Sequence, residues 1–143
     1  MLSVKIVNKS KHALPSYATN QSAGMDLRAE LTEPIELKPL QRALVPTALF
    51  IELPAGYEAQ IRPRSGLALK HGISLVNTPG TIDSDYPDEW MVIVRNPGRT
   101  PIRIEHGERI AQMVLARYET LVIESGSVGV STDRVGGFGS TGH

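Results

Sequence analysis

Short segments of alternating apolar and polar residues run along most of the chain, separated by turns rich in proline and glycine. Residues 57–62 (YEAQIR) alternate with the period of two that is typical of a β-strand with one buried face. Similar runs predict further strands at residues 4–7, 35–37, 73–76, 91–94, 102–104, 110–116 and 121–123. Strands this short and evenly spaced predict an all-β domain: a sandwich, a jelly roll or a barrel.

Residues 65–71 depart from this alternation and predict one short helix. Ser65 stands where a side chain can cap the first turn, and Gly72 follows where a helix commonly ends. The chain has 13 glycines and 10 prolines, too many for a bundle of long helices.

The length of 143 residues fits one domain. We expect residues 1–125 to form the β domain and the glycine-rich residues 126–143 to be a flexible C-terminal tail. Because 15 basic and 15 acidic residues cancel, the charge argues against a general binder of nucleic acid or of membranes. No signal segment is visible, and the absence of cysteine excludes disulfides and thiolate metal sites, so we expect a cytoplasmic protein.

Two segments suggest phosphate chemistry. Residues 63–66 (PRSG) combine an arginine fork with the unpaired N–H groups of a helix start, which makes them a candidate phosphate cradle; the alternative is an ordinary turn with a surface arginine. Residues 80–86 (GTIDSDY) place two carboxylates and an aromatic ring at a hairpin or strand turn. A carboxylate there could orient and deprotonate a water, whereas the alternative is an acidic, solvated loop.

Two polar side chains lie in apolar surroundings. Asp26, within residues 23–27 (AGMDL), needs a partner to offset burial, and structural pairing and a metal-linked role both fit. Gln112 needs partners for its amide, most simply as a satisfied core residue. The four histidines show no metal-ligand spacing and are assigned no role: His12, His71, His106 and His143.

The glycine-rich residues 136–142 (GGFGSTG) offer free amides and hydroxyls that can wrap phosphate oxygens, with Phe138 to cover a base. The alternative is an ordinary glycine-rich end.

The order of the segments is more specific than any one of them. The series 23–27, 63–68, 80–86, 109–113 (RIAQM) and 136–142 resembles the five ordered motifs of the trimeric dUTP diphosphatases, the dUTPase family.

This resemblance, which covers nearly the whole chain, implies a β jelly-roll (β-clip) domain and a homotrimer with active sites at the subunit interfaces. It implies hydrolysis of dUTP to dUMP and pyrophosphate with Mg2+ on the triphosphate, which limits uracil incorporation into DNA and supplies dUMP for dTMP synthesis. Asp83 would hold the water that attacks the α-phosphorus, Asp26 would support the metal through water, and Tyr86 would pack under the deoxyribose. The resemblance implies uracil contacts from Asn77, Gly80, Thr81 and Ile82, and a further substrate contact from Met91. The phosphates would be bound by Arg64, Ser65, Gly66 and Gln112. A tail that closes over the nucleotide would contribute Arg134, Phe138, Gly139, Ser140 and Thr141.

A few residues within the motifs differ from the usual family pattern or distinguish this chain from related enzymes. Pro87 and Asp88 stand where the family usually has arginine and glycine, so the exit of the third motif is expected to differ. A dCTP deaminase typically has a second serine at the position of Gly66 and a Pro-Gly pair after the aspartate of motif three, so this chain favours the diphosphatase. The alternatives are a dCTP deaminase, a bifunctional dCTP deaminase/dUTPase, and a non-catalytic nucleotide-binding regulator of the same fold.

Overall fold

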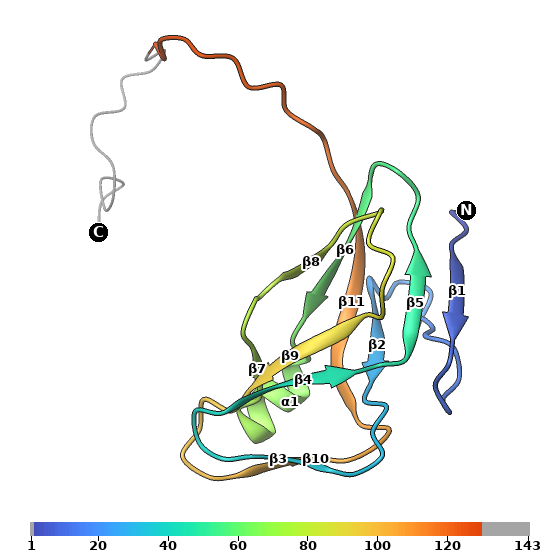
Figure 1. The fold of residues 1–143 in the computed structure, drawn as a ribbon, viewed down its shortest axis with the longest axis vertical. Helices are drawn as coiled ribbons and strands as arrows, with labels where there is room; N and C mark the ends of the chain where they lie inside the picture. Colours follow the sequence, from blue (N-terminus) through green and yellow to red (C-terminus); the bar gives the residue numbers. More distant parts are fainter. Residues whose placement is uncertain (1, 130–143) are drawn as a thin grey trace.

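The computed structural model describes residues 2–129 and shows an antiparallel β fold with one short helix (Figure 1). In that range the elements are β1 (Lys5–Asn8), β2 (Gly24–Arg28), β3 (Ile35–Leu37), β4 (Arg42–Pro46), β5 (Leu49–Glu52), β6 (Tyr57–Arg62), α1 (Ser65–His71), β7 (Ser74–Leu75), β8 (Gly80–Ile82), β9 (Met91–Arg95), β10 (Ile102–Ile104) and β11 (Arg109–Arg117). The prediction of an all-β domain with a helix at residues 65–71 is confirmed. Within the same residues, no helix is both long and apolar enough to cross a membrane.

Two antiparallel sheets make up most of the domain. The larger has the strand order β2-β11-β6-β8 and the smaller β4-β9-β7, and the pairs β1-β5 and β3-β10 complete the fold. Inward side chains form one core, whose largest fully buried members include Trp90, Leu27 and Ile104. Because β11 is central in the larger sheet, its Gln112 lies opposite Asp26 on β2 and Arg62 on β6. Polar residues of β2, β11 and β6 therefore lie side by side in the larger sheet.

The uncharged residues 43–51 contain a corner of the chain. They include most of β4 and most of β5, which are separated by Thr47 and by Ala48, whose φ is 55°. The buried Thr47 hydroxyl donates to the carbonyl of Trp90 at 2.5 Å and accepts the N–H of Leu49 at 3.2 Å. These bonds satisfy the backbone where the chain changes direction.

Helix α1 starts differently from the prediction. Its N-cap is Arg64, which has an extended backbone and makes no side-chain capping bond, so the prediction that Ser65 caps the helix is wrong. Ser65 is the first helical residue instead, and the Arg64 side chain reaches Asp26 rather than its own turn. Gly72 ends the helix as expected, in the left-handed conformation with φ of 63°.

The predicted strand at residues 121–123 is not formed in the described part of the chain. These residues belong to an extended arm, residues 118–129, which leaves β11 and runs away from the domain (Figure 1). Leu121, Val122 and Ile123 are 85%, 89% and 91% exposed. An apolar run needs a neighbouring strand to become part of a sheet, and residues 2–129 of one chain do not supply it.

Candidate active site

Asp26 lies on β2 between two arginines. Arg64, at the β6–α1 junction, donates from Nε to Oδ1 of Asp26 at 2.6 Å, and Arg109, which begins β11, donates from Nη1 to Oδ2 at 3.3 Å. The side chains of Arg64 and Asp26 are 24% and 34% exposed, so the ion pair is partly buried. Of the two interpretations of Asp26, the structural pairing is present. Two guanidinium groups on one carboxylate leave an excess of positive charge that suits an anion.

Gln112 occupies the position on β11 opposite Asp26. Its Nε2 donates one hydrogen bond to the carbonyl of Pro63 at 2.9 Å, and the half-buried side chain lines a cavity and is not enclosed in the core. A Cβ placed on Gly24 would lie only 2.5 Å from Oε1 of Gln112. Glycine at position 24 therefore lets β2 start directly against the amide oxygen.

A polar cavity of about 460 Å³ opens beside these residues. It is lined by all the residues of the described range that we expected at the phosphates and the metal: Asp26, Arg64, Ser65, Gly66 and Gln112. Arg62 and Arg109 line it too, so three guanidinium groups and one carboxylate face the same space. Such a concave, cationic surface attracts a polyanion.

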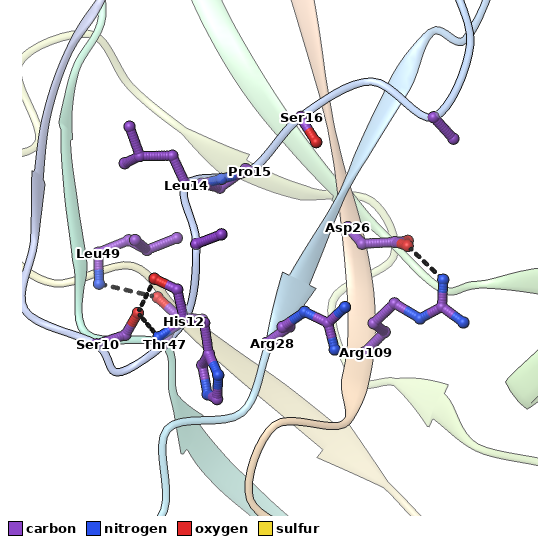
Figure 2. Close-up of a pocket in the computed structure, with 12 residues that line it drawn as sticks. Ser10, His12, Leu14, Pro15, Ser16, Asp26, Arg28, Thr47, Leu49 and Arg109 are labelled. Carbon is purple, nitrogen blue, oxygen red and sulfur yellow. Dashed lines mark hydrogen bonds and ion pairs between the residues drawn. The ribbon is translucent and has the colours of Figure 1, made fainter.

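A neighbouring cavity of about 260 Å³ shares Asp26 and Arg109 with the first one (Figure 2). In it, Arg28 of β2 lies beside Arg109, and its Nη1 donates to the carbonyl of Gly107 at 2.8 Å. His12, from the loop after β1, lines the same cavity. The positive charge around Asp26 therefore continues along β2.

The segment at residues 80–86 crosses between the sheets. Within the described residues β8 pairs with β6, whereas β9 pairs with β4 and β7, so the segment is a strand turn and not a hairpin between paired strands. The N–H of Tyr86 closes the turn on the carbonyl of Asp83 at 3.2 Å. Asp83 is exposed, and the Tyr86 hydroxyl donates to the carbonyl of Glu89 at 3.3 Å.

A cavity of about 280 Å³ lies at this turn. Its apolar lining includes Ile61, Leu75, Trp90 and Val92, and the predicted residues around it are Asn77, Gly80, Thr81, Ile82, Asp83, Tyr86 and Met91. A Cβ on Gly80 would lie 3.2 Å from Nδ2 of Asn77, so the two residues are in close contact. An apolar space with a carboxylate and an aromatic ring suits a flat, partly polar ligand.

The predicted site residues thus form two groups. Within residues 2–129, the cavity at Asp83 and the cavity at Asp26 share no lining residue. The five predicted tail residues lie outside the described residues: Arg134, Phe138, Gly139, Ser140 and Thr141. In the described part of the chain, Asp83 therefore lines a different cavity from the arginines of the polar cavity.

Sequence reasoning assigned no role to Arg109 or to the histidines. Arg109 begins β11 just before the apolar pair Ile110 and Ala111, and this charge at the strand start was the signal that could have found its pairing with Asp26. His12 and His106 lie together, with ring centroids 4.6 Å apart. Their separation along the sequence gave no local pattern for this contact.

Solved dUTPase chains have the same fold. The dUTPase of Staphylococcus bacteriophage 80alpha with dUpNHpp matches with a TM-score of 0.86 and 24% identity, over 99% of both chains. A mutant dUTPase from phage phi11 of S. aureus, described with a structural Mg(II) ion, matches with a TM-score of 0.80 and 18% identity, over 89% of this chain and 98% of that one. The architecture is thus the jelly-roll type of the dUTPases, as predicted.

Sequence comparison defines the family. The model of the dUTPase family matches residues 10–142. A deoxyuridine 5'-triphosphate nucleotidohydrolase of Cytophaga hutchinsonii is 58% identical over 98% of this chain and 92% of its own length. The protein of the same name from Finegoldia magna is 52% identical over 99% of this chain and 100% of its own. The chain belongs to the dUTPase family.

Proposed function

We propose that the protein hydrolyses dUTP to dUMP and pyrophosphate. The observation that carries this proposal is the exposed Asp83 carboxylate, which lines the same cavity as the Tyr86 ring and the apolar Ile61 and Trp90. A pyrimidine nucleoside fits such a space, with the carboxylate near its phosphate. The names of the relatives at 58% and 52% identity support dUTP as the substrate.

Uracil would lie against β8. Among the described strands, β8 pairs only with β6, so the backbone groups along its outer edge are available to a ligand. The edge of uracil presents an acceptor, a donor and an acceptor, which the N–H and C=O groups of Gly80, Thr81 and Ile82 can match. Cytosine has a donor in place of the O4 acceptor and an acceptor in place of the N3–H donor, so it would leave buried groups unpaired and would be rejected. Asn77 adds a side-chain amide beside Gly80.

Tyr86 would pack under the deoxyribose and leave no room for a 2'-hydroxyl. Its hydroxyl bond to Glu89 restrains the ring, which is 43% exposed and therefore accessible to a sugar. Met91, at the start of β9, lines the same cavity and would add an apolar contact.

The triphosphate would lie in the polar cavity. Arg64 supplies a guanidinium next to the first turn of α1, and Ser65 and Gly66 supply N–H groups there that have no partner within the helix. Gln112 has a second amide hydrogen besides the one given to Pro63. This donor set is suited to phosphate oxygens.

Asp26 fits an indirect role toward Mg2+. Both of its oxygens already accept hydrogen bonds from arginines, at 2.6 Å and 3.3 Å, so it fits the binding of metal-held water better than direct ligation. When bound to the triphosphate, Mg2+ would neutralise part of the charge that builds up on the leaving group. Arg64 would fix the orientation of the Asp26 carboxylate.

Asp83 would supply the base. Its exposed carboxylate would hold a water and accept its proton while the water oxygen bonds to the α-phosphorus. The bond from the α-phosphorus to the bridging oxygen then breaks, and pyrophosphate leaves with the electron pair. Phosphoryl transfer of this kind depends on alignment and on charge neutralisation, which the polar cavity would provide.

Two subunits would be needed for one site, because the Asp83 and Asp26 cavities are separate within the described chain. We therefore include a homotrimer in the proposal, with active sites at the subunit contacts. The exposed apolar residues 121–123 support association, since an apolar arm without a partner is unfavourable in water. From the sequence, residues 126–143 would close over the nucleotide, with Phe138 on uracil, Arg134 near the γ-phosphate, and Gly139, Ser140 and Thr141 around the phosphates.

The test is a pyrophosphate-release assay with dUTP, UTP, dTTP and dCTP, with and without Mg2+. We expect release from dUTP in the presence of Mg2+ and little from the other three. Ammonia release from dCTP would overturn the proposal in favour of a deaminase. Binding of dUTP without turnover would overturn it in favour of a nucleotide-binding regulator.

A further inference from the structure

Three metal-ligating side chains meet where the loop after β1, the end of β2 and the β10–β11 turn come together. The ligand atoms of His12, Glu30 and His106 all lie within 4.8 Å of one another. The two imidazole rings are inclined by 36°. The side chains of His12 and Glu30 are only 17% and 19% exposed, so two of the three groups are largely withdrawn from water.

The backbone around the cluster is held from several sides. The N–H of Ala29 donates to the carbonyl of Glu108 at 2.9 Å, and the N–H of Gly107 returns to the carbonyl of Ala29 at 2.8 Å. Nδ2 of Asn8 donates to the carbonyl of His12 at 2.9 Å. Ligands whose backbone is already fixed need little rearrangement to bind an ion.

The spacing at His12 suits a tetrahedral metal ion. Its Nε2 lies 3.2 Å from Oε2 of Glu30 and 3.3 Å from the carbonyl oxygen of Ala29. In a tetrahedral site with bonds of about 2.1 Å, two ligand atoms lie about 3.4 Å apart. Both neighbours of Nε2 are acceptors, so a proton on this nitrogen would lie between them. A divalent cation can take the place of that proton.

His106 can supply the third ligand at small cost. Its Nδ1 accepts the N–H of Leu31 at 3.1 Å, a hydrogen bond that is exposed to solvent. Water can replace His106 as the partner of this amide, which frees the imidazole to turn toward the ion. Two imidazoles and one carboxylate form a donor set that suits Zn2+ and related transition metals, whereas Mg2+ prefers oxygen ligands.

We propose that His12, Glu30 and His106 form a site for a divalent transition-metal ion of the Zn2+ type, distinct from any Mg2+ carried by a nucleotide. The ion would join three segments that are far apart in the sequence. Since a metal that binds the folded state and not the unfolded one stabilises the fold, it would raise the melting temperature.

The test uses the untagged full-length chain and Zn2+ alone. We expect saturable binding of one ion per chain and a rise in melting temperature with Zn2+. His12→Gln and His106→Gln should each weaken binding at least ~10-fold, the smallest loss seen when even an outer partner of a metal ligand is removed. The matched control, His71→Gln on the exposed face of α1, should bind as the unchanged chain does.

Circular dichroism checks that each variant is folded, and His106→Gln keeps the test open if His12→Gln is not, because His106 is exposed. A visible Co2+ spectrum that His106→Gln weakens would support nitrogen ligation by this residue. The proposal is overturned if the unchanged chain shows no saturable binding of Zn2+, or if His12→Gln and His106→Gln both bind it with full affinity.

Discussion

Arg64 and Asp26, 38 positions apart in the sequence, are joined by a hydrogen bond of 2.6 Å between Nε and Oδ1. This bond fixes the β6–α1 junction against β2, so it orients the groups proposed to bind the triphosphate. A lysine at position 64 would keep the charge and lose the planar fork that can hold Asp26 and a phosphate together.

We therefore expect Arg64→Lys to lower kcat/KM for Mg-dUTP by at least ~10-fold, about 1.4 kcal/mol of transition-state stabilisation. Its effect on the free energy of unfolding should stay below ~1 kcal/mol, because the ion pair is partly exposed. Steady-state kinetics and urea unfolding measure the two effects. The control is Arg103→Lys, whose partner Glu105 is on the exposed surface. Equal kinetics for both variants would contradict the role of Arg64.

Asp83→Asn should still bind dUTP and lose at least ~100-fold in pyrophosphate release, because the amide cannot accept the proton of the attacking water. Asp85→Asn, two positions along the same exposed turn, is the matched control and should retain most of the activity. Calorimetric binding of dUpNHpp separates affinity from turnover. Near-normal turnover by Asp83→Asn would remove Asp83 from the chemical step.

Tyr86→Ala should raise the relative rate with UTP, because the ring that closes the space for a 2'-hydroxyl is gone. Tyr86→Phe should keep the discrimination, since only the hydroxyl bond to Glu89 is lost and the ring remains. The measurement is the ratio of kcat/KM for dUTP to kcat/KM for UTP. If both variants discriminate like the unchanged protein, sugar selection lies elsewhere.

Gly24→Ala should destabilise the fold by about 0.5–1.5 kcal/mol, the usual net contribution of the one hydrogen bond that is lost. The new methyl group would lie 2.5 Å from Oε1 of Gln112, and the amide would have to leave the carbonyl of Pro63 to make room. Gly126→Ala, where a Cβ would have no neighbour within 4 Å, is the control. Thermal unfolding compares them, and equal melting temperatures would show that Gln112 moves freely.

Truncation after Val130 should abolish most of the activity and leave the fold of the β domain intact. The reason is that residues 131–143 contain Phe138 and the hydroxyl and glycine residues expected to cover the nucleotide. Pyrophosphate release, circular dichroism and size-exclusion chromatography test this prediction. Normal turnover by the truncated chain would rule out closure by the tail.

The sequence predicted local features well where periodicity determines them. The alternation at residues 57–62 became β6, and Gly72 ended the helix because a left-handed residue is needed there. Prediction from the sequence failed where contacts between distant residues determine the local structure. Ser65 looked like a cap, but Arg64 extends toward Asp26 and takes the N-cap position instead.

The candidate site shows the same division. The order of the motifs identified Asp26, Asp83 and Gln112 as site candidates, yet the register of β2 and β6 against β11 is what sets Gln112 opposite Asp26 and Arg62. Residues 121–123 were predicted as a strand from their apolar and β-branched side chains and from the spacing of such runs along the chain. Their exposure reflects the lack of a pairing strand within the described chain, which no pattern in the segment reports.

The division of the predicted residues between two cavities also has a genetic consequence. Under the proposed assembly, an active site is a property of a contact between copies and not of one copy. A chain defective only at Asp83 would spoil a site to which a neighbour contributes intact arginines, and the reverse holds for a chain defective at Arg64. A chain altered at one of these residues should therefore inactivate no more sites than its own share of the chains, whereas an Asp83 allele and an Arg64 allele together should partly complement each other.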